Sequence, residues 1–332
     1  MFKIFYYLLI AFFLVSCESD SYDLVIQNGI IYDGSGSESE SADIGIIGNQ
    51  IVKVGKINSK NSLKIIDASG LVVSPGFIDT HAHLDPMSNF IKLSNGESHV
   101  RQGVTTSFGG PDGRGVPLKY GFKEFLDSIE KVGVGMNVGF LTGHNKIRRV
   151  VMNLDNREPT EEELERMKNL ASKAMDEGAF GISTGLKYLP GNFSKVDEVI
   201  EISKEISKKG GVYTSHLRDE GLKIIEAVNE AIKISKDADI SVVLTHHKVI
   251  GKPMWGKSSI TLSLIDSARQ KGIKVMADQY PYNASHTGIN VLIPTWARAG
   301  GSQEFKDRVS DKSTREKIEK EIVFNILNDR GG

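Results

Sequence analysis

Short apolar runs alternate with turn-forming dipeptides in the first part of the chain, from Tyr22 to about Ser74. The segments DLVIQNGIIYDG, ADIGIIGNQIVKVGKI and KIIDASGLVVSPG carry Val and Ile at the spacing of strands, and Asn-Gly, Asp-Gly and Gly-Asn pairs interrupt them. Such pairs between apolar runs are typical of β-hairpins. We therefore predict a small β-domain over residues 22–74.

The pattern changes after Pro75, where a short apolar strand, a loop and an amphipathic segment follow one another repeatedly. Strands that alternate with helices are typical of βα units and a parallel sheet. Seven strands are expected, at Gly76–His83, Thr105–Gly109, Asn137–Gly143, Ala179–Thr184, Val212–His216, Ser241–His246 and Lys274–Gln279. Helices are expected at Lys119–Lys131, Thr160–Glu177, Lys195–Lys209, Asp219–Ser235 and Ser258–Lys271.

This order predicts an α/β fold with a (β/α)8 TIM-type barrel over residues 75–332. A closed barrel needs eight strands, but only a polar helical stretch, roughly Gln303–Asn328, follows the seventh. We therefore expect the barrel to be truncated before strand 8. The alternative, an open seven-stranded sheet, would expose a long parallel edge. Because strand edge and apolar surface would be uncovered, we expect this chain by itself to have little activity and poor solubility.

The first 17 residues, MFKIFYYLLIAFFLVSC, follow a different pattern, in which Lys3 precedes the twelve apolar residues Ile4–Val15. The apolar run is too short to span a bilayer and is typical of a secretory signal peptide. Leu14-Val15-Ser16-Cys17 also resembles the lipobox of bacterial lipoproteins, which implies cleavage before Cys17 and its acylation. We expect an exported lipoprotein, anchored to the membrane on the periplasmic or cell-surface side. The alternative is a plain signal peptide with a chance cysteine.

Composition narrows the classes of function. The 41 Lys and Arg residues nearly balance the 42 Asp and Glu residues, which gives a formal net charge of −1. This balance disfavours general nucleic-acid binding, because no basic excess is available for a phosphate backbone. A single cysteine excludes an internal disulfide and a cysteine-rich metal site.

Four histidines stand at the ends of predicted strands. The segment GFIDTHAHLD places His81 and His83 two residues apart, so we expect both side chains on one face of a strand. His216 ends the run VYTSH and His246 ends SVVLTH. Imidazoles gathered at the C-terminal ends of barrel strands favour a metal site. Each histidine taken singly could instead be structural.

Several other residues could complete such a site. Asp79 and Asp85 could orient the ring of a ligand histidine. Asp112 follows the second strand in QGVTTSFGGPDG, and its two oxygens could bridge two cations. The alternative for Asp112 is a turn residue before Gly113. His144 ends the third strand and could contact substrate or stay behind the ligands.

The motifs PGFIDTHAHLD, QGVTT, GISTGLKYLPG, YTSHLRDEG, THHKVIGK and ADQYPYNAS together resemble the N-acyl-D-amino-acid deacylase (D-aminoacylase) branch of the amidohydrolase superfamily, over nearly all of residues 22–332. The resemblance implies a barrel with a small β-sandwich built from both chain ends. It also implies zinc-dependent hydrolysis of N-acyl-D-amino acids to a carboxylate and a D-amino acid. His216 and His246 would hold a tightly bound metal, and His81 and His83 a second, weaker one.

The chain departs from this family in two places. Asp112 stands where D-aminoacylases commonly have a bridging cysteine, so we expect nitrogen and oxygen ligands only and a weaker preference for zinc over manganese or cobalt. A carboxylated lysine is a lesser possibility, with Lys187 as the nearby candidate. The family's catalytic aspartate is expected beyond Gly332, so no catalytic residue is assigned within the chain.

Substrate contacts are expected from further strand-end residues. By resemblance, Tyr188, Lys248 and Ser285 are candidates to hold the α-carboxylate, and a cation with two hydroxyl donors suits that group. Arg218 lies two residues after His216, so it shares the face of that residue and is a fourth candidate. The expected partner is a small N-acyl amino acid, and no protein partner is predicted.

Three other functions stay open at this stage. The chain could be another amidohydrolase that acts on a cyclic amide, a dipeptide or a different N-acyl compound. It could be a metal-binding or ligand-binding lipoprotein without turnover, because no general base is assigned within it. A purely structural envelope protein would leave the clustered histidines unexplained.

Overall fold

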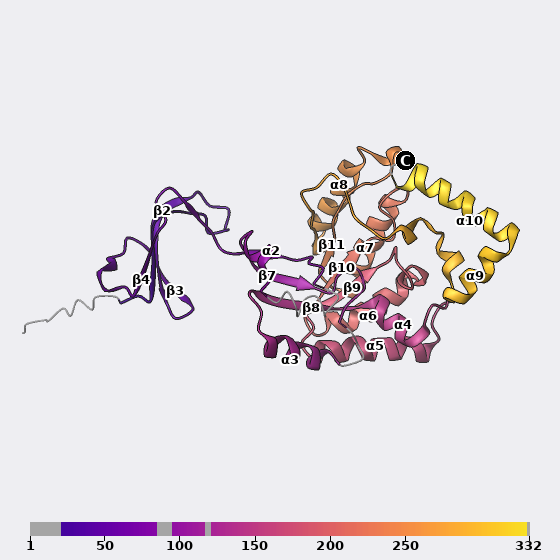
Figure 1. Cartoon of the computed structure of the whole chain (residues 1–332), viewed down its shortest axis with the longest axis horizontal. Helices are drawn as coiled ribbons and strands as arrows, with labels where there is room; N and C mark the ends of the chain where they lie inside the picture. Colours follow the sequence, from indigo (N-terminus) through magenta and orange to yellow (C-terminus); the bar gives the residue numbers. More distant parts are fainter. Residues whose placement is uncertain (1–20, 85–94, 117–120, 331–332) are drawn as a thin grey trace, which may run out of the picture. The chain divides into compact units, whose positions relative to one another are not determined.

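The computed structural model describes residues 21–84, 95–116 and 121–330 (Figure 1). The chain divides into two compact units, residues 1–76 and 77–332. The predicted signal peptide with Cys17 lies outside the described residues, and so does Asp85. Within the described ranges, no helix has the length and apolar character needed to cross a bilayer.

The first unit contains one mixed sheet, with β1 at its centre. Its strands are β1 (Leu24–Ile31), β2 (Glu40–Ile47), β3 (Gln50–Gly55), β4 (Lys64–Asp67) and β5 (Val72–Val73). β2 pairs antiparallel with β1 and β3, whereas β4 and β5 pair parallel with β1. Between β2 and β3 the turn consists of Gly48 and Asn49, and Gly48 has a φ of 58°. A small core of Tyr22, Val25 and Ile57 packs beside the sheet.

The second unit is built on seven parallel strands in the order β12-β11-β10-β9-β8-β7-β6. Each strand lies beside the next one in the sequence, which is the arrangement of a TIM-type barrel. The strands are β6 (Phe77–Asp79), β7 (Val104–Gly109), β8 (Asn137–Gly143), β9 (Gly181–Gly185), β10 (Val212–His216), β11 (Val242–Leu244) and β12 (Val275–Ala277). The described residues contain no eighth strand of this sheet, so the predicted incomplete TIM-type fold is confirmed.

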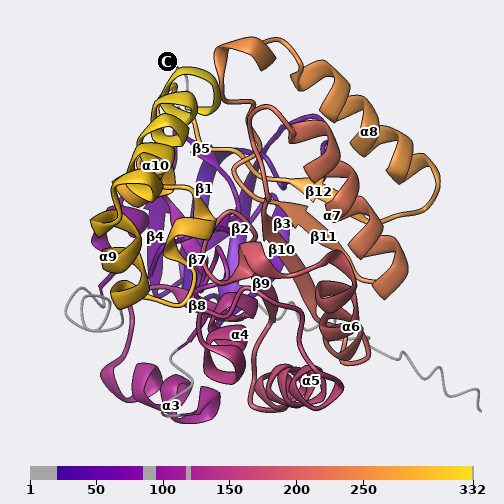
Figure 2. The same cartoon turned by 90° about the vertical axis from the view of Figure 1, so that its right-hand side faces the viewer.

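Most helices of the second unit follow the predicted ranges. They are α2 (Glu97–Val100), α3 (Phe122–Val132), α4 (His144–Met152), α5 (Glu161–Asp176), α6 (Val196–Ser207), α7 (Ile224–Ala238), α8 (Ser258–Gln270), α9 (Ser302–Ser310) and α10 (Lys312–Phe324). Short 3-10 helices include η3 (Gly191–Phe193), η5 (Ile289–Leu292) and η6 (Thr295–Arg298). Figure 2 shows α5, α6, α7 and α8 in succession along the outside of the strands.

Local hydrogen bonds explain where the helices begin. Thr160 and Glu163 form the capping box expected at the start of α5. α7 begins five residues later than predicted, because the Asp219 carboxylate accepts from the backbone of Gly221 and Lys223 in a turn. The stretch expected as one helix near residues 303–328 is divided at Asp311, whose side chain caps α10.

Apolar packing between the sheet and the outer helices places the polar strand ends at one edge. Val242 and Leu244 of β11 are fully buried with Val228 and Ile234 of α7. His216 ends β10, so its side chain emerges where the apolar part of the strand stops. In parallel barrels this C-terminal edge carries the functional residues.

Candidate metal centre

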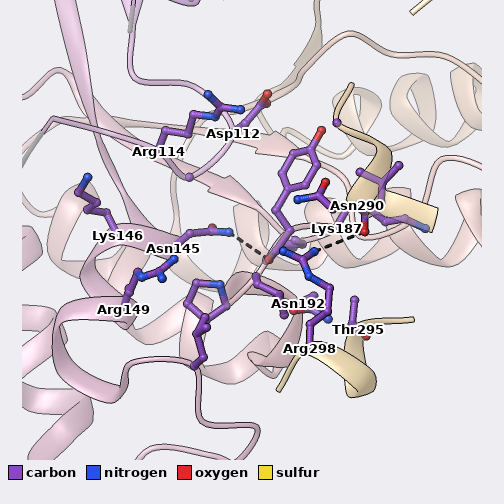
Figure 3. Close-up of a pocket in the computed structure, with 18 of the residues that line it drawn as sticks. Asp112, Arg114, Asn145, Lys146, Arg149, Lys187, Asn192, Asn290, Thr295 and Arg298 are labelled. Atoms are coloured by element: carbon purple, nitrogen blue, oxygen red, sulfur yellow. Dashed lines mark hydrogen bonds between the residues drawn. The ribbon is translucent and has the colours of Figure 1, made fainter. Parts of the chain in front are cut away.

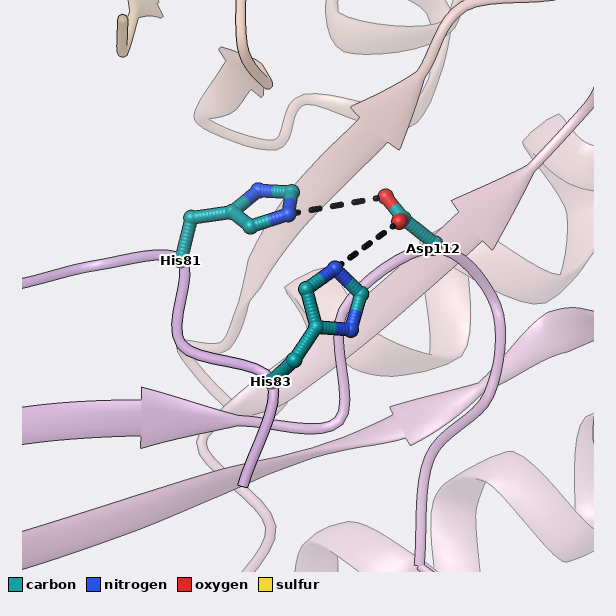
Figure 4. A group of neighbouring side chains, drawn as sticks. All are labelled: His81, His83 and Asp112. Atoms are coloured by element: carbon teal, nitrogen blue, oxygen red, sulfur yellow. Dashed lines mark ion pairs between the residues drawn. The ribbon is translucent and has the colours of Figure 1, made fainter. Parts of the chain in front are cut away.

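His81 and His83 lie in the loop after β6, and the expectation that both stand on the strand is wrong. β6 ends at Asp79, because the Asp79 carboxylate accepts a hydrogen bond of 3.0 Å from the backbone N–H of His81. The loop still directs both imidazoles to one carboxylate (Figure 4). His81 Nε2 lies 3.7 Å from Asp112 Oδ1, and His83 Nε2 lies 3.3 Å from Asp112 Oδ2.

Asp112 is presented by a tight glycine-rich turn after β7. Its φ is 56°, in the left-handed region that Asp tolerates better than most residues. The side chain of Ser183 holds the turn, because its Oγ accepts from Gly113 N at 3.0 Å and donates to Gly110 O at 2.6 Å. A Cβ on Gly115 would lie 2.2 Å from the backbone nitrogen of Gly143. The turn therefore packs directly against the end of β8.

His216 and His246 approach the same carboxylate from the other side. His216 Nδ1 and His246 Nε2 each lie 3.6 Å from Asp112 Oδ1, and the two nitrogens are 2.7 Å apart. The structure thus brings together all five residues predicted as ligands, in two groups that share Asp112. One group contains His81 and His83, the other His216 and His246.

The donor set fits a divalent metal ion. Around a tetrahedral Zn²⁺ with Zn–N and Zn–O distances near 2 Å, neighbouring ligand atoms lie about 3.3 Å apart. The distances from Asp112 to the four imidazoles, 3.3 to 3.7 Å, are close to this spacing. Asp112 Oδ1 is buried and has no hydrogen-bond partner among the described residues. Such atoms are costly to bury unless a ligand or ion contacts them.

Electrostatics in the centre favour an ionised carboxylate surrounded by imidazoles. Burial alone would raise the pKa of Asp112, but the neighbouring imidazoles of His216, His246 and His83 outweigh it and hold that pKa well below its ordinary value. Burial lowers the pKa of His81 to about 4, so this ring is neutral at pH 7. Neutral imidazole is the form that binds a metal ion.

Two acidic residues support the histidines, and the sequence analysis did not assign either of them. Glu220 is buried, and its Oε1 lies 2.9 Å from His246 Nδ1 and 2.5 Å from Lys248 Nζ. Asp278, just after β12, accepts from the backbone N–H of His246, and its other oxygen lies 3.9 Å from His81 Nδ1. Their positions after strands β10 and β12 were the available signal.

The predicted substrate residues are distributed around this centre. The Tyr188 ring lies 4.5 Å from the His216 ring, and burial raises the pKa of Tyr188 to about 12. Lys248 contacts Glu220, as described above, and lies 5.7 Å from the centre of the Tyr280 ring. Ser285 is exposed in the segment after β12. These three side chains stay predictions as substrate contacts.

Arg218, Lys187 and His144 have protein partners of their own. Arg218 forms an ion pair of 2.8 Å with Glu230 and donates to the backbone oxygens of residues 192 and 194. Lys187 lies 3.0 Å from Asp329, the shorter of its two ion pairs. His144 is fully buried, and its Nε2 lies 2.8 Å from Glu198 Oε1, so its side chain contacts this glutamate.

Known proteins are similar to this chain over most of its length. A model of the amidohydrolase family matches residues 64–191. D-aminoacylase from Alcaligenes xylosoxydans xylosoxydans is 35% identical over 81% of this chain and 59% of its own length. A crystal structure of D-aminoacylase superposes with a TM-score of 0.73 at 34% identity, over 79% of this chain and 59% of that one.

N-acyl-D-glutamate deacylase from Bordetella bronchiseptica is a third similar protein. Its crystal structure, in complex with zinc and a phosphonate inhibitor, superposes with a TM-score of 0.75 at 30% identity. The match covers 79% of this chain and 59% of that one. The chain therefore spans about three fifths of the length of the relatives that it matches.

Proposed function

Because the chain belongs to the amidohydrolase family, we propose that it hydrolyses the amide bond of N-acyl-D-amino acids, giving a carboxylate and a D-amino acid. The observation that carries this proposal is the carboxylate of Asp112, which faces four imidazoles at the C-terminal edge of a TIM-type sheet. The similarity to D-aminoacylase supports the choice of substrate. Zinc is the proposed metal, and manganese or cobalt are alternatives because the ligands are nitrogen and oxygen.

His216, His246 and Asp112 would hold one ion, and His81, His83 and Asp112 a second one. These residues would hold a metal ion whose chemistry, when bound, would be to lower the pKa of a water and polarise the acyl carbonyl. Glu220 positions the first group, because it accepts from His246 Nδ1 and so would leave the Nε2 lone pair available to a metal ion. Asp278 holds the backbone of the same residue, because its carboxylate accepts from the His246 backbone N–H.

The remaining residues would bind and orient the substrate. Tyr188 has a pKa of about 12, so its hydroxyl is protonated at physiological pH and can donate a hydrogen bond to a carboxylate. Lys248 supplies a positive charge next to the metal ligands, held in place by Glu220. We propose that these two side chains, with Ser285, hold the α-carboxylate. We assign the role of general base to none of the described residues.

A substrate panel tests this proposal. The zinc-loaded full-length protein, with the aspartate expected beyond Gly332, is assayed with N-acetyl-D-leucine, N-acetyl-L-leucine and dihydrouracil; released amine is measured for the two N-acetyl compounds, and consumption of the ring compound is followed by chromatography. Hydrolysis of the D-compound alone is the expected result. Turnover restricted to the cyclic compound would instead place the protein with ring-opening amidohydrolases. A His246→Ala variant should lose the zinc ion of the first ligand group together with the activity, whereas Arg166→Gln, an exposed change on α5, should keep both.

We also propose that residues 1–17 direct export and that Cys17 carries the lipid anchor. The apolar run followed by Leu-Val-Ser-Cys supports this proposal. Cells that express the protein are grown with a clickable fatty acid, and label on the wild type but not on a Cys17→Ser variant is expected. A wild type without label would contradict the anchor.

A further inference from the structure

Asn145, in the first turn of α4, lies between two loops of the candidate site, the turn that carries Asp112 and the loop that carries Tyr188. All three residues line the same cavity. Figure 3 shows the amide of Asn145 directed at the loop of Lys187 and Asn192, with one hydrogen bond drawn from it. The side chain is buried, and no role proposed above uses it.

The hydrogen bonds of this amide all close the loop of Tyr188. Asn145 Oδ1 accepts from Gly185 N at 3.0 Å, and Nδ2 donates to Gly185 O at 2.9 Å and to Tyr188 O at 3.2 Å. The same two carbonyl oxygens accept from the backbone N–H groups of Tyr188 and Asn192, both at 2.9 Å. Because both N–H groups of the amide are used within the protein, Asn145 acts on the loop and has no donor left for a substrate.

Two glycines enclose the amide so closely that it has a single place in the fold. A Cβ on Gly113, the residue after Asp112, would lie 2.0 Å from Asn145 Oδ1. A Cβ on Gly191, at the end of the Tyr188 loop, would lie 2.6 Å from both the oxygen and the nitrogen of the amide. The amide is therefore packed against the turn of the metal ligand on one side and against the Tyr188 loop on the other.

The helix that carries the amide is itself held in place. His144 and Arg148 are fully buried and both contact the carboxylate of Glu198 on α6. The backbone of the helix also holds the turn of the metal ligand, since Lys146 N donates to Gly113 O at 3.2 Å. One helix therefore connects the turn of the metal ligand, through its backbone, with the loop of the proposed substrate residue, through one side chain.

We propose that Asn145 is a positioning residue, which holds the Tyr188 hydroxyl at a fixed place relative to Asp112, where that hydroxyl binds the α-carboxylate of the substrate. This inference rests on the proposed function, in which Tyr188 contacts the substrate. The Tyr188 ring lies 4.5 Å from the ring of His216, so a shift of its loop changes the place of the hydroxyl relative to the ligand histidines. Since Asn145 acts on substrate binding, its loss should raise KM and leave kcat nearly unchanged.

Kinetic constants for N-acetyl-D-leucine, measured on the zinc-loaded full-length protein, test the proposal. In Asn145→Ala the KM should rise at least about 10-fold, because a hydrogen bond to a charged group is lost, whereas kcat should change less than about 3-fold. Zinc affinity, measured by competition with a chelator, should fall by less than about 10-fold, because Ser183 still holds the turn of Asp112. Ser235→Ala, which removes a buried hydrogen bond of 2.6 Å to Ile240 O, is the control and should keep the wild-type KM.

A double-mutant cycle separates positioning from a general loss of stability. Adding Asn145→Ala to Tyr188→Phe should raise KM by less than about 2-fold more, because the hydroxyl that Asn145 positions is already absent. Gly191→Ala displaces the amide without removing its hydrogen-bonding groups, so it should raise KM in the same way. If Asn145→Ala does not fold, the same cycle with Gly191→Ala decides.

The outcomes distinguish this inference from the proposed function. A wild-type KM in these variants, or effects that multiply in full with that of Tyr188→Phe, would overturn the positioning role and leave the proposed function standing. A wild type that does not hydrolyse N-acetyl-D-leucine would overturn the proposed function, and the inference with it.

Discussion

Asp112 has to meet two requirements at one position, one on its side chain and one on its backbone conformation. Its carboxylate is shared by both groups of candidate ligands, and its backbone has a φ of 56°. Asn and Asp occupy this left-handed conformation several-fold more often than other non-glycine residues. An acidic residue here therefore satisfies the turn as well as the metal centre. A cysteine at the same position would supply a softer ligand at a higher backbone cost.

Glu220 is expected to determine how tightly the first ion is held. In Glu220→Gln one carboxylate oxygen becomes an amide N–H₂, so the residue can no longer accept from His246 and neutralise Lys248 together. Loss of such a supporting group typically weakens a metal site about 10- to 100-fold. We expect a fall of at least about 10-fold in zinc affinity, measured by competition with a chromogenic chelator. Glu226→Gln, an exposed change on α7, is the control, and equal affinities in all three proteins would contradict this role.

The sequence predicted the ligand histidines and Asp112 but not their supporting residues. Each of the four histidines taken singly could be structural, but their combination after three predicted strands formed a recognisable pattern. Glu220 and Asp278 follow strands β10 and β12, but acidic residues in such loops are commonly solvated, so their position alone did not separate them from other loop carboxylates. Their function follows only from the packing that buries Glu220 against His246.

At the scale of elements, the strands were predictable and α4 was not. Parallel strands buried on both faces are short apolar runs, and β8 and β10 have the predicted bounds. α4 lacks such a signal, because two of its buried positions are His144 and Arg148 rather than apolar residues. Both bond Glu198 of α6, fifty or more residues away, so their burial depends on a long-range contact.

The turn after β7 is an element whose packing can be tested with a matched pair of glycines. Gly115 and Gly272 both have positive φ, of 55° and 81°, but only Gly115 would place a Cβ against backbone, 2.2 Å from Gly143 N. Gly272→Ala should therefore cost about 1–2 kcal/mol, from backbone conformation alone. Gly115→Ala should cost more and also lower zinc affinity, because it displaces the turn that carries Asp112. Urea unfolding and zinc titration of both variants measure this, and equal effects would refute the packing argument.

At the scale of the whole molecule, Glu198 connects stability to pH. Burial alone would raise its pKa, but His144 and Arg148 outweigh this and lower it from the ordinary value of 4.5. A lowered folded-state pKa means that the stabilisation is fully present above about pH 4.5 and is lost as the pH falls through the folded value. Glu198→Gln should lose about 3 kcal/mol at pH 7, because Arg148 keeps a buried charge without its partner.

The measurement is the free energy of unfolding between pH 7 and pH 3. The wild type should lose stability below pH 4.5, and Glu198→Gln should lose less over the same interval. Glu165→Gln removes an exposed ion pair with Lys168 and should change the unfolding free energy at pH 7 by less than about 1 kcal/mol. A Glu198→Gln variant as stable as the wild type at pH 7 would show that the buried network contributes little.

Metal binding should stabilise the second unit as a whole, because the ligands come from distant parts of its sheet. His81 and His83 follow β6, whereas His246 follows β11, and four strands lie between these two in the sheet. Zinc at 100 times its dissociation constant adds about 2.7 kcal/mol to a folded state that alone binds it. For a unit of this size, this corresponds to a rise in Tm of roughly 5–10 °C. The double change His81→Ala/His246→Ala removes one ligand from each group and should abolish the rise, whereas His286→Ala, at an exposed position outside both ligand groups, should retain it. A rise that persists in the double variant would place the stabilising zinc at another site, and the argument from Asp112 to a hydrolase would lose its support.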